Sequence, residues 1–150
     1  MASCFDYAVH YISRYPKTEF ELRLQLRKKK YGEDEIDSSI QILKDKNYVN
    51  DYQYAKLYVN SEVGRKGKPL GPILMKLKSK WVSKEIIQQV KWELDDEIQS
   101  WTQAKIAREI EKYKAKGMNG FDIIQKLRSR GYRIQDIKKV VEGNAGEESQ

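Results

Sequence analysis

Residues 21–40 read ELRLQLRKKKYGEDEIDSSI, and their spacing of apolar residues returns in PILMKLKSKWVSKEIIQQV (72–90) and DIIQKLRSRGYRIQDIKKVV (122–141). The three stretches align on Leu26, Leu77 and Leu127. Apolar residues then fall at matching distances from these leucines: Leu22, Ile73 and Ile123; Tyr31, Trp81 and Tyr132; Ile36, Ile86 and Ile137; Ile40, Val90 and Val141. A period of about 50 residues indicates tandem structural repeats.

A further helix is predicted upstream of each stretch. These segments begin near Ala8, Ala55 and Ala104, and apolar residues follow each alanine three and four positions apart. This spacing forms one apolar stripe along a helix, and the stripe has to face a core. Each repeat is therefore expected to contain three helices.

Turn and capping residues separate the helices. Pro16 ends the first, Thr18 and Glu21 form a capping box for the second, and residues 64–72 hold three glycines and two prolines. We predict helices over these ranges: 3–14, 18–30, 33–46, 51–66, 70–80, 83–94, 97–116, 120–130 and 134–142. The fold class is all-α, with three tandem three-helix repeats at 3–50, 51–96 and 97–142 in an elongated curved array. Residues 143–150 are expected to be a disordered tail.

Composition favours a binding protein over an enzyme. The 150 residues include 29 Lys plus Arg against 22 Asp plus Glu, and the net charge of +7 suits a polyanion or an acidic protein surface. One cysteine and one histidine argue against a zinc site, and no phosphate loop, G-x-S-x-G or H-E-x-x-H motif occurs. No signal pattern or run of about 20 apolar residues is present. We expect a cytoplasmic monomer without membrane attachment or cofactor.

Basic residues recur in each repeat, mainly on its second helix. Between Val63 and Lys84 the chain has no acidic residue. A short first helix, a tight turn and a basic second helix resemble a helix-turn-helix. The pattern favours a basic track for nucleic acid or a nucleoprotein filament over a merely solvated face, and lysines suit phosphates better than base edges. The candidate binding residues are Arg23, Arg27, Lys28, Arg65, Lys66, Lys68, Lys76, Lys78, Lys80, Lys126, Arg128 and Arg130.

Aromatic residues are a second candidate for nucleic-acid contacts, since bases stack on them. Tyr31, Trp81 and Tyr132 occupy matching repeat positions, which favours core packing for these three. Four tyrosines gather near the junction of the first two repeats and are expected to form a core there: Tyr48, Tyr52, Tyr54 and Tyr58.

Four short motifs in order resemble those of the bacterial RecX family, which modulates the recombinase RecA. KTEFEL at 17–22 is similar to R-S-x-x-E-L, and YVND at 48–51, with the following Tyr54-Ala55, is similar to Y-[IL]-[ND]-D-x-x-[FY]-A. Residues 71–77 resemble G-x-x-x-I-x-x-E-L with Lys76 in place of Glu, and residues 127–132 resemble L-x-x-R-G-[FY]. The family's K-G-[IV] reads KWV at 80–82, without the glycine.

The resemblance covers about residues 6–142 and implies a function. Such a protein would bind in the groove of the RecA filament on single-stranded DNA, restrain filament extension, and act in recombination, DNA repair and the SOS response. It implies no catalytic residue, and bare DNA is expected to bind weakly and without sequence specificity. The alternative is an independent, repressor-type DNA-binding protein, for which sequence-specific binding without RecA would be diagnostic.

Overall fold

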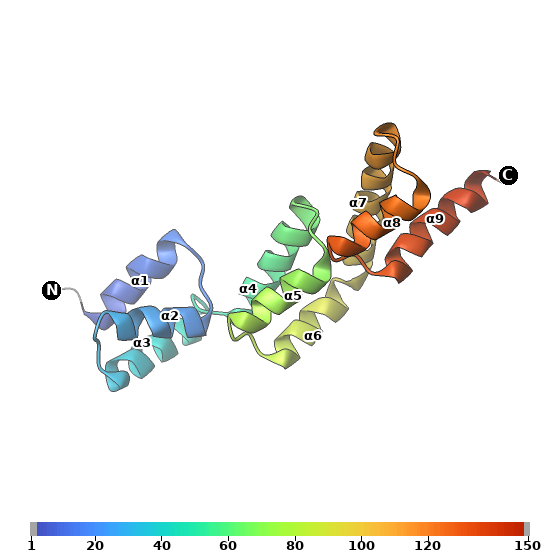
Figure 1. The fold of residues 1–150 in the computed structure, drawn as a ribbon. Coiled ribbons are helices and arrows are strands. Elements are labelled where there is room, and N and C mark those ends of the chain that lie inside the picture. The colour runs from blue at the N-terminus through green and yellow to red at the C-terminus, as the bar shows by residue number, and fades with distance from the viewer. Residues whose placement is uncertain (1–2, 149–150) are drawn as a thin grey trace. The chain divides into compact units, whose positions relative to one another are not determined.

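The computed structural model describes residues 3–148, which form helices and the connections between them, with no strand in that range (Figure 1). The first repeat contains α1 (Cys4–Arg14), α2 (Glu19–Lys28) and α3 (Glu33–Asp45). The second contains α4 (Asp51–Val59), which continues as the π-helix η1 (Asn60–Arg65), followed by α5 (Leu70–Ser79) and α6 (Lys84–Glu93). The third contains α7 (Asp95–Ala115), α8 (Gly120–Ser129) and α9 (Ile134–Glu148). The predicted all-α class is confirmed.

Contacts along the chain divide it into two compact units. One comprises the chain up to Tyr58 together with Lys76–Val90, and the other comprises Val59–Met75 together with the chain from Lys91 onward. The middle repeat therefore contributes residues to both units. The prediction that each repeat is a domain of its own, with boundaries at 51 and 97, stays a prediction.

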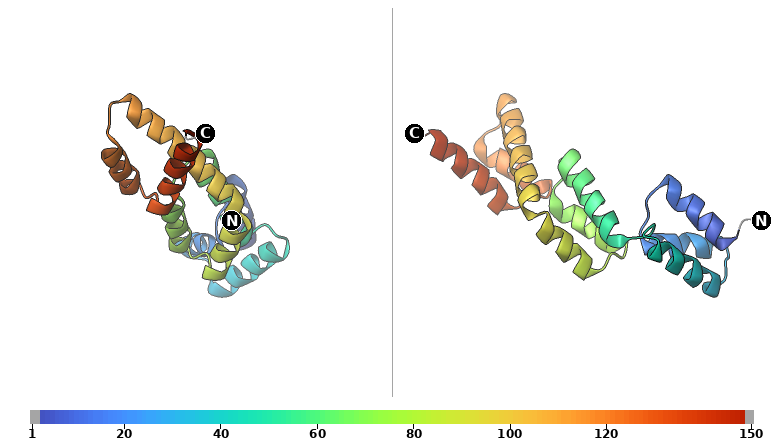
Figure 2. Two further views of the ribbon diagram at one scale, coloured as in Figure 1. Left: turned by 90° about the vertical axis from the view of Figure 1, so that its right-hand side faces the viewer. Right: turned by 180° about the vertical axis from the view of Figure 1, so that it is seen from behind.

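The core of the first unit lies among α1, α2 and α3, which stay together in all the views of Figures 1 and 2. Leu22 and Leu26 of α2 meet Ile36 and Ile40 of α3, and all four are buried. Burying one such side chain contributes about 1.5–3 kcal/mol. The predicted capping box at the start of α2 is present, because the Thr18 hydroxyl accepts a hydrogen bond from the amide of Glu21, whose carboxylate accepts one from the Thr18 amide.

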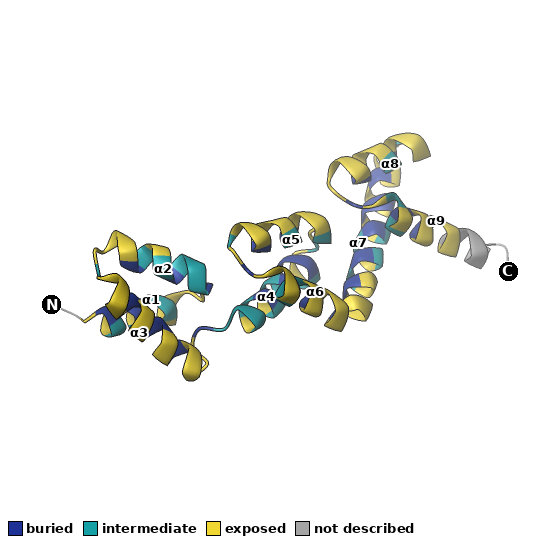
Figure 3. Ribbon diagram, turned by 90° about the horizontal axis from the view of Figure 1, so that it is seen from below, coloured by how far each residue is buried: buried dark blue, intermediate teal, exposed yellow. Residues whose placement is uncertain are grey.

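The second unit has its core among α7, α8 and α9. Ile106 and Ile110 of α7 pack with Ile123 and Leu127 of α8 and with Ile137 of α9. Figure 3 shows that buried positions recur along α7, whereas much of α8 is exposed. The anchor leucines Leu26, Leu77 and Leu127 are all fully buried, which confirms the alignment at these three positions.

The predicted core role of Trp81 is wrong. Its side chain is 69% exposed and its φ is 61°, in the left-handed region where a residue with a Cβ pays about 1–2 kcal/mol. Lys30 and Gly131 also have positive φ, each two residues after the matching helix ends. Trp81 is thus the equivalent of Gly131, and the buried equivalent of Tyr132 is Val82. The alignment slipped by one residue because this turn has no glycine to mark it.

Smaller corrections have similar causes. On α7 the exposed Ala104 is not the buried repeat position, which Thr102 occupies, and on α9 Val140 is buried while Val141 is 46% exposed. Tyr48 is 64% exposed, so it is not part of a core. The last helix runs to Glu148, beyond its predicted end at 142. Residues 149 and 150 of the expected tail lie outside the described residues.

Candidate nucleic-acid interface

The twelve predicted binding residues occupy two kinds of place. Arg23, Arg27, Lys28, Lys76, Lys78, Lys80, Lys126, Arg128 and Arg130 lie on the second helix of a repeat or just beyond its end. Arg65, Lys66 and Lys68 instead lie on η1 and the connection after it. Ten of the twelve are exposed, whereas Arg23 and Lys80 are half-buried. Their charges are far from equally available, because several have acidic partners.

On α2, the two arginines are neutralised within the first repeat. Arg23 donates a hydrogen bond to Asp37 at 2.6 Å and lies 3.7 Å from Glu19. Arg27 donates to Glu33 at 2.7 Å, and this hydrogen bond lowers the pKa of the Glu33 carboxyl. Both arginines therefore hold α2 to α3, Arg27 at the first residue of that helix and Arg23 at its second turn.

Lys80 also has a structural role. Its ammonium lies 3.2 Å from the Glu21 carboxylate and 5.6 Å from the ring centres of both Tyr54 and Tyr58. Burial by itself lowers the pKa of Lys80, but hydrogen bonds to Tyr54 and Glu21 outweigh it and the pKa is raised. The Thr18 hydroxyl donates to the Lys80 carbonyl at 3.1 Å, so the end of α5 is tied to the start of α2.

Two buried glutamates form ion pairs with further basic side chains in the second unit. Glu62 on η1 pairs with Lys66 at 2.9 Å and with Lys68 at 2.6 Å. Glu109 on α7 pairs with Lys105 at 3.1 Å and with Arg130 at 3.5 Å. Three of the predicted binding residues are thus partners of a buried carboxylate.

The sequence predictions missed these two glutamates, although their spacing is a signal for them. Glu62 lies between the buried Val59 and Val63, and Glu109 lies between the buried Ile106 and Ile110 at the same spacing. In two repeats, an acidic residue stands at the same position of the apolar stripe. This pattern predicts a buried ion pair, because a buried charge needs a partner.

Six candidate cations remain without an ion pair to any residue in 3–148, and all six are exposed: Lys28, Arg65, Lys76, Lys78, Lys126 and Arg128. We call them the free cations. Five occupy the last turn of α2, α5 or α8, where a positive charge also favours the negative end of the helix dipole. That effect is worth about 0.3–1 kcal/mol per charge and acts alike at the end of each of the three helices.

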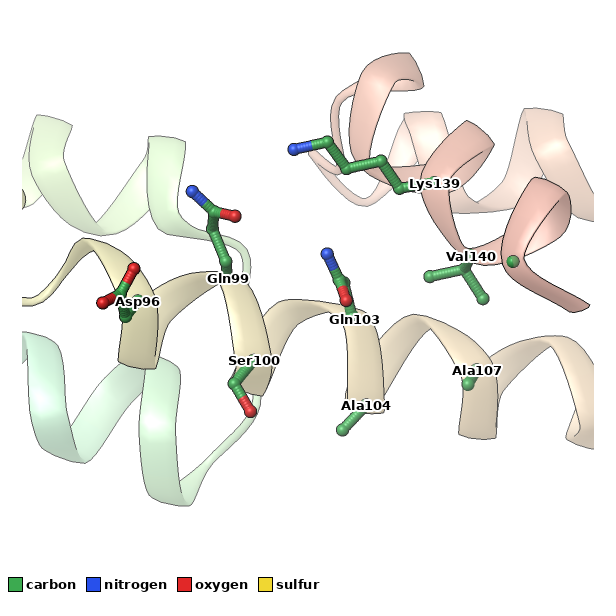
Figure 4. A pocket seen from close by; sticks show the side chains of 9 residues that line it. Asp96, Gln99, Ser100, Gln103, Ala104, Ala107, Lys139 and Val140 are labelled. Atoms are coloured by element: carbon green, nitrogen blue, oxygen red, sulfur yellow. The ribbon is translucent and has the colours of Figure 1, made fainter.

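No other feature of the described chain offers a stronger site. A shallow groove between α7 and α9 is lined largely by small and polar side chains, with Gln99 and Gln103 opposite Lys139 (Figure 4). Within residues 3–148, no group of histidine, cysteine, aspartate or glutamate side chains is arranged to hold a metal ion. Asp95 and its two acidic neighbours form the first turn of α7, which suits the positive end of that helix. None of the described helices is long and apolar enough to cross a membrane.

The sequence is similar to those of known proteins. Residues 4–43 match the family model described as the first three-helix domain of RecX. The chain is 28% identical to the regulatory protein RecX of Haemophilus influenzae strain 86-028NP, over 95% of each chain. It is 31% identical to the regulatory protein RecX of Clostridium perfringens strain SM101, over 92% of this chain and 66% of that one.

The fold is shared as well. The crystal structure of RecX from Lactobacillus salivarius is similar with a TM-score of 0.81 at 22% identity, over 93% of both chains. A first repeat that matches the family model, similarity along nearly the whole sequence and a common all-helical fold lead to one assignment. This chain belongs to the RecX family of regulatory proteins.

Proposed function

We propose that this protein regulates the recombinase RecA by binding the RecA filament on single-stranded DNA, and that it inhibits filament activity. The observation that carries the proposal is the recurrence of free cations at the same helix end in each of the three repeats. Membership of a family of regulatory proteins supports it further. In this proposal the protein acts as a cytoplasmic monomer and a binding protein, without a catalytic step or a cofactor.

The free cations suit a filament of protein and DNA because such a polymer repeats its negative charges. Each three-helix repeat would contribute a modest electrostatic contact, and their covalent linkage would make the contacts act together as one stronger site. The paired residues Arg23, Arg27 and Lys80 hold helices together in this scheme. They would affect binding only through stability.

Co-sedimentation with RecA filaments tests this proposal. Filaments are formed on single-stranded DNA with a slowly hydrolysed ATP analogue, and the bound fraction of this protein is measured over a range of salt concentrations. We expect binding to be much stronger when both RecA and DNA are present than with either alone, and to weaken in the variant Lys76→Glu with Lys78→Glu. The matched control is Lys112→Glu with Lys114→Glu, which makes the same charge change in the last turn of α7.

The contrary outcomes are distinct. Sequence-specific binding to bare duplex DNA, with no gain on adding RecA, would support the repressor-type alternative. If both charge-reversed variants weaken binding equally, the effect depends only on net charge. The free cations of α5 are then not part of the interface.

A further inference from the structure

Trp81 stands in a left-handed turn that recurs at the end of the second helix of each repeat, but the fold does not explain a bulky side chain there. Its φ of 61° favours glycine, and the equivalent position of the third repeat is Gly131. The indole nevertheless remains 69% exposed, so it adds little to the core. A bulky residue kept in a strained backbone position is a reason to look for function.

The side chain of Trp81 is part of a small aromatic surface. Its ring stacks on that of Phe20, with centroids 5.1 Å apart and an angle of 28° between the ring planes. Phe20 is the second residue of α2, where the capping box and the hydrogen bond from Thr18 to Lys80 fix the two chain segments together. The indole is thus supported by a ring whose position is fixed by the fold.

Two lysines without an acidic partner in the described part of the chain flank Trp81 in the sequence. Exposed Lys78 and Lys84 lie three residues to either side of Trp81, and neither pairs with an acid among the described residues. The neighbouring carboxylate of Glu21 is compensated by Lys80 at 3.2 Å. An aromatic face beside uncompensated lysines has the features that bind single-stranded nucleic acid, because bases stack on the ring while phosphates meet the cations.

We propose that the Phe20–Trp81 pair is a stacking platform for an unpaired base of single-stranded DNA, and that it gives the protein a preference for single strands over duplex. The inference deepens the proposed function, on which it rests, by naming the DNA form that one part of the interface recognises. A duplex offers its phosphates to Lys78 and Lys84 equally well. Its bases are stacked on each other, so they cannot use the indole.

The test is a fluorescence-anisotropy titration of the whole protein with three labelled probes. These are an oligothymidylate, a duplex of the same length, and a strand with the same number of phosphates but abasic sites in place of bases. The main variant is Trp81→Gly, which removes the ring and suits the left-handed backbone, so it keeps the fold. Trp81→Phe retains an aromatic ring, and Trp92→Ala removes a tryptophan that is 80% exposed on α6.

We expect Trp81→Gly to weaken oligothymidylate binding about fivefold or more, the loss that removing one base–aromatic stack produces. Its binding to the duplex and to the abasic strand should be unchanged. Trp81→Phe should recover part of the affinity, and Trp92→Ala should match the original protein. Oligothymidylate should also quench tryptophan fluorescence in the original protein but much less in Trp81→Gly.

Other outcomes overturn the platform. Unchanged oligothymidylate binding in Trp81→Gly would exclude stacking, and equal losses on all three probes would indicate a general effect on the surface. If Trp81→Gly loses binding to RecA filaments but not to the oligothymidylate, Trp81 is a contact for protein. Because these titrations contain no RecA, a result that supports the platform stands even if the protein has no effect on RecA, and the two claims fail separately.

Discussion

At the scale of single residues, the sequence predicts a role correctly where the type of the side chain and its spacing are enough to define that role. The capping box of Thr18 and Glu21 and the buried Leu26 follow from side-chain type and spacing, and both are confirmed. Trp81 could not be placed in this way, because an aromatic residue at the end of an apolar pattern normally points inward. Its exposure depends on the backbone turning left-handed without a glycine, which composition and periodicity do not reveal.

Two substitutions at Trp81 separate strain from contact. Trp81→Ala loses the stack on Phe20, worth about 0.5–1.5 kcal/mol, and keeps the unfavourable φ. Trp81→Gly loses the same stack but removes the strain. We therefore expect the glycine variant to be more stable than the alanine variant by about 1 kcal/mol, measured by urea unfolding. Equal stability of the two variants would show that position 81 is unstrained.

The two buried glutamates predict how stability depends on pH. Hydrogen bonds from Lys68 and Lys66 lower the pKa of Glu62 below its ordinary value of 4.5. Burial raises the pKa of Glu109, but a hydrogen bond from Lys105 and the nearby charges outweigh it, so this pKa is also lowered. A carboxyl whose pKa is lower in the folded state stabilises the fold above its unfolded pKa, and this contribution is lost as the pH falls through the folded value.

The free energy of unfolding should therefore decrease as the pH falls below about 4.5. Glu62→Gln with Glu109→Gln should be less stable near neutral pH by about 2–5 kcal/mol, because two charged hydrogen-bonded groups are lost. The same variant should lose less stability on acidification than the original protein. Chemical unfolding followed by circular dichroism at neutral and acidic pH measures both effects, and an unchanged acid slope would rule out these glutamates as its source.

At the scale of elements, helix existence was easier to predict than register. The expected helices all begin within two residues of the bounds that the structure has, and Thr18, Asn50, Ser83 and Asn119 cap four of them. The π-helical turn at Asn60–Arg65, which contacts α7, was not foreseen, and its residues were predicted as part of one helix over 51–66. The prediction of the buried face of α5 is confirmed at Ile73 and Leu77.

The two faces of α5 should respond differently to the same truncation. Leu77 is fully buried, so Leu77→Ala should cost about 2–5 kcal/mol through lost burial and the cavity that remains. Met75 on the same helix is 67% exposed, and Met75→Ala should stay within about 0.5 kcal/mol. Thermal or chemical unfolding of the two variants measures the contrast. A large loss for Met75→Ala would mean that this face of α5 is covered.

At the scale of the whole molecule, composition predicted a basic binding protein but not which charges are available. Six of the twelve candidate residues have acidic partners, and the partners of Lys66, Lys68 and Arg130 are buried. Packing between helices brings pairs such as Arg130 and Glu109 together, so a count of basic residues overstates the interface. The elongated array expected from the repeats stays a prediction.

The hydrolysis of ATP by RecA on single-stranded DNA tests the central claim most directly. With this protein added well below the RecA concentration, we predict inhibition, because one bound molecule would obstruct the addition of RecA to a filament or favour its loss. Lys76→Glu with Lys78→Glu should need a higher concentration for the same inhibition, while Lys112→Glu with Lys114→Glu should inhibit as the original protein does. Unchanged hydrolysis with the protein in excess over RecA would contradict the account.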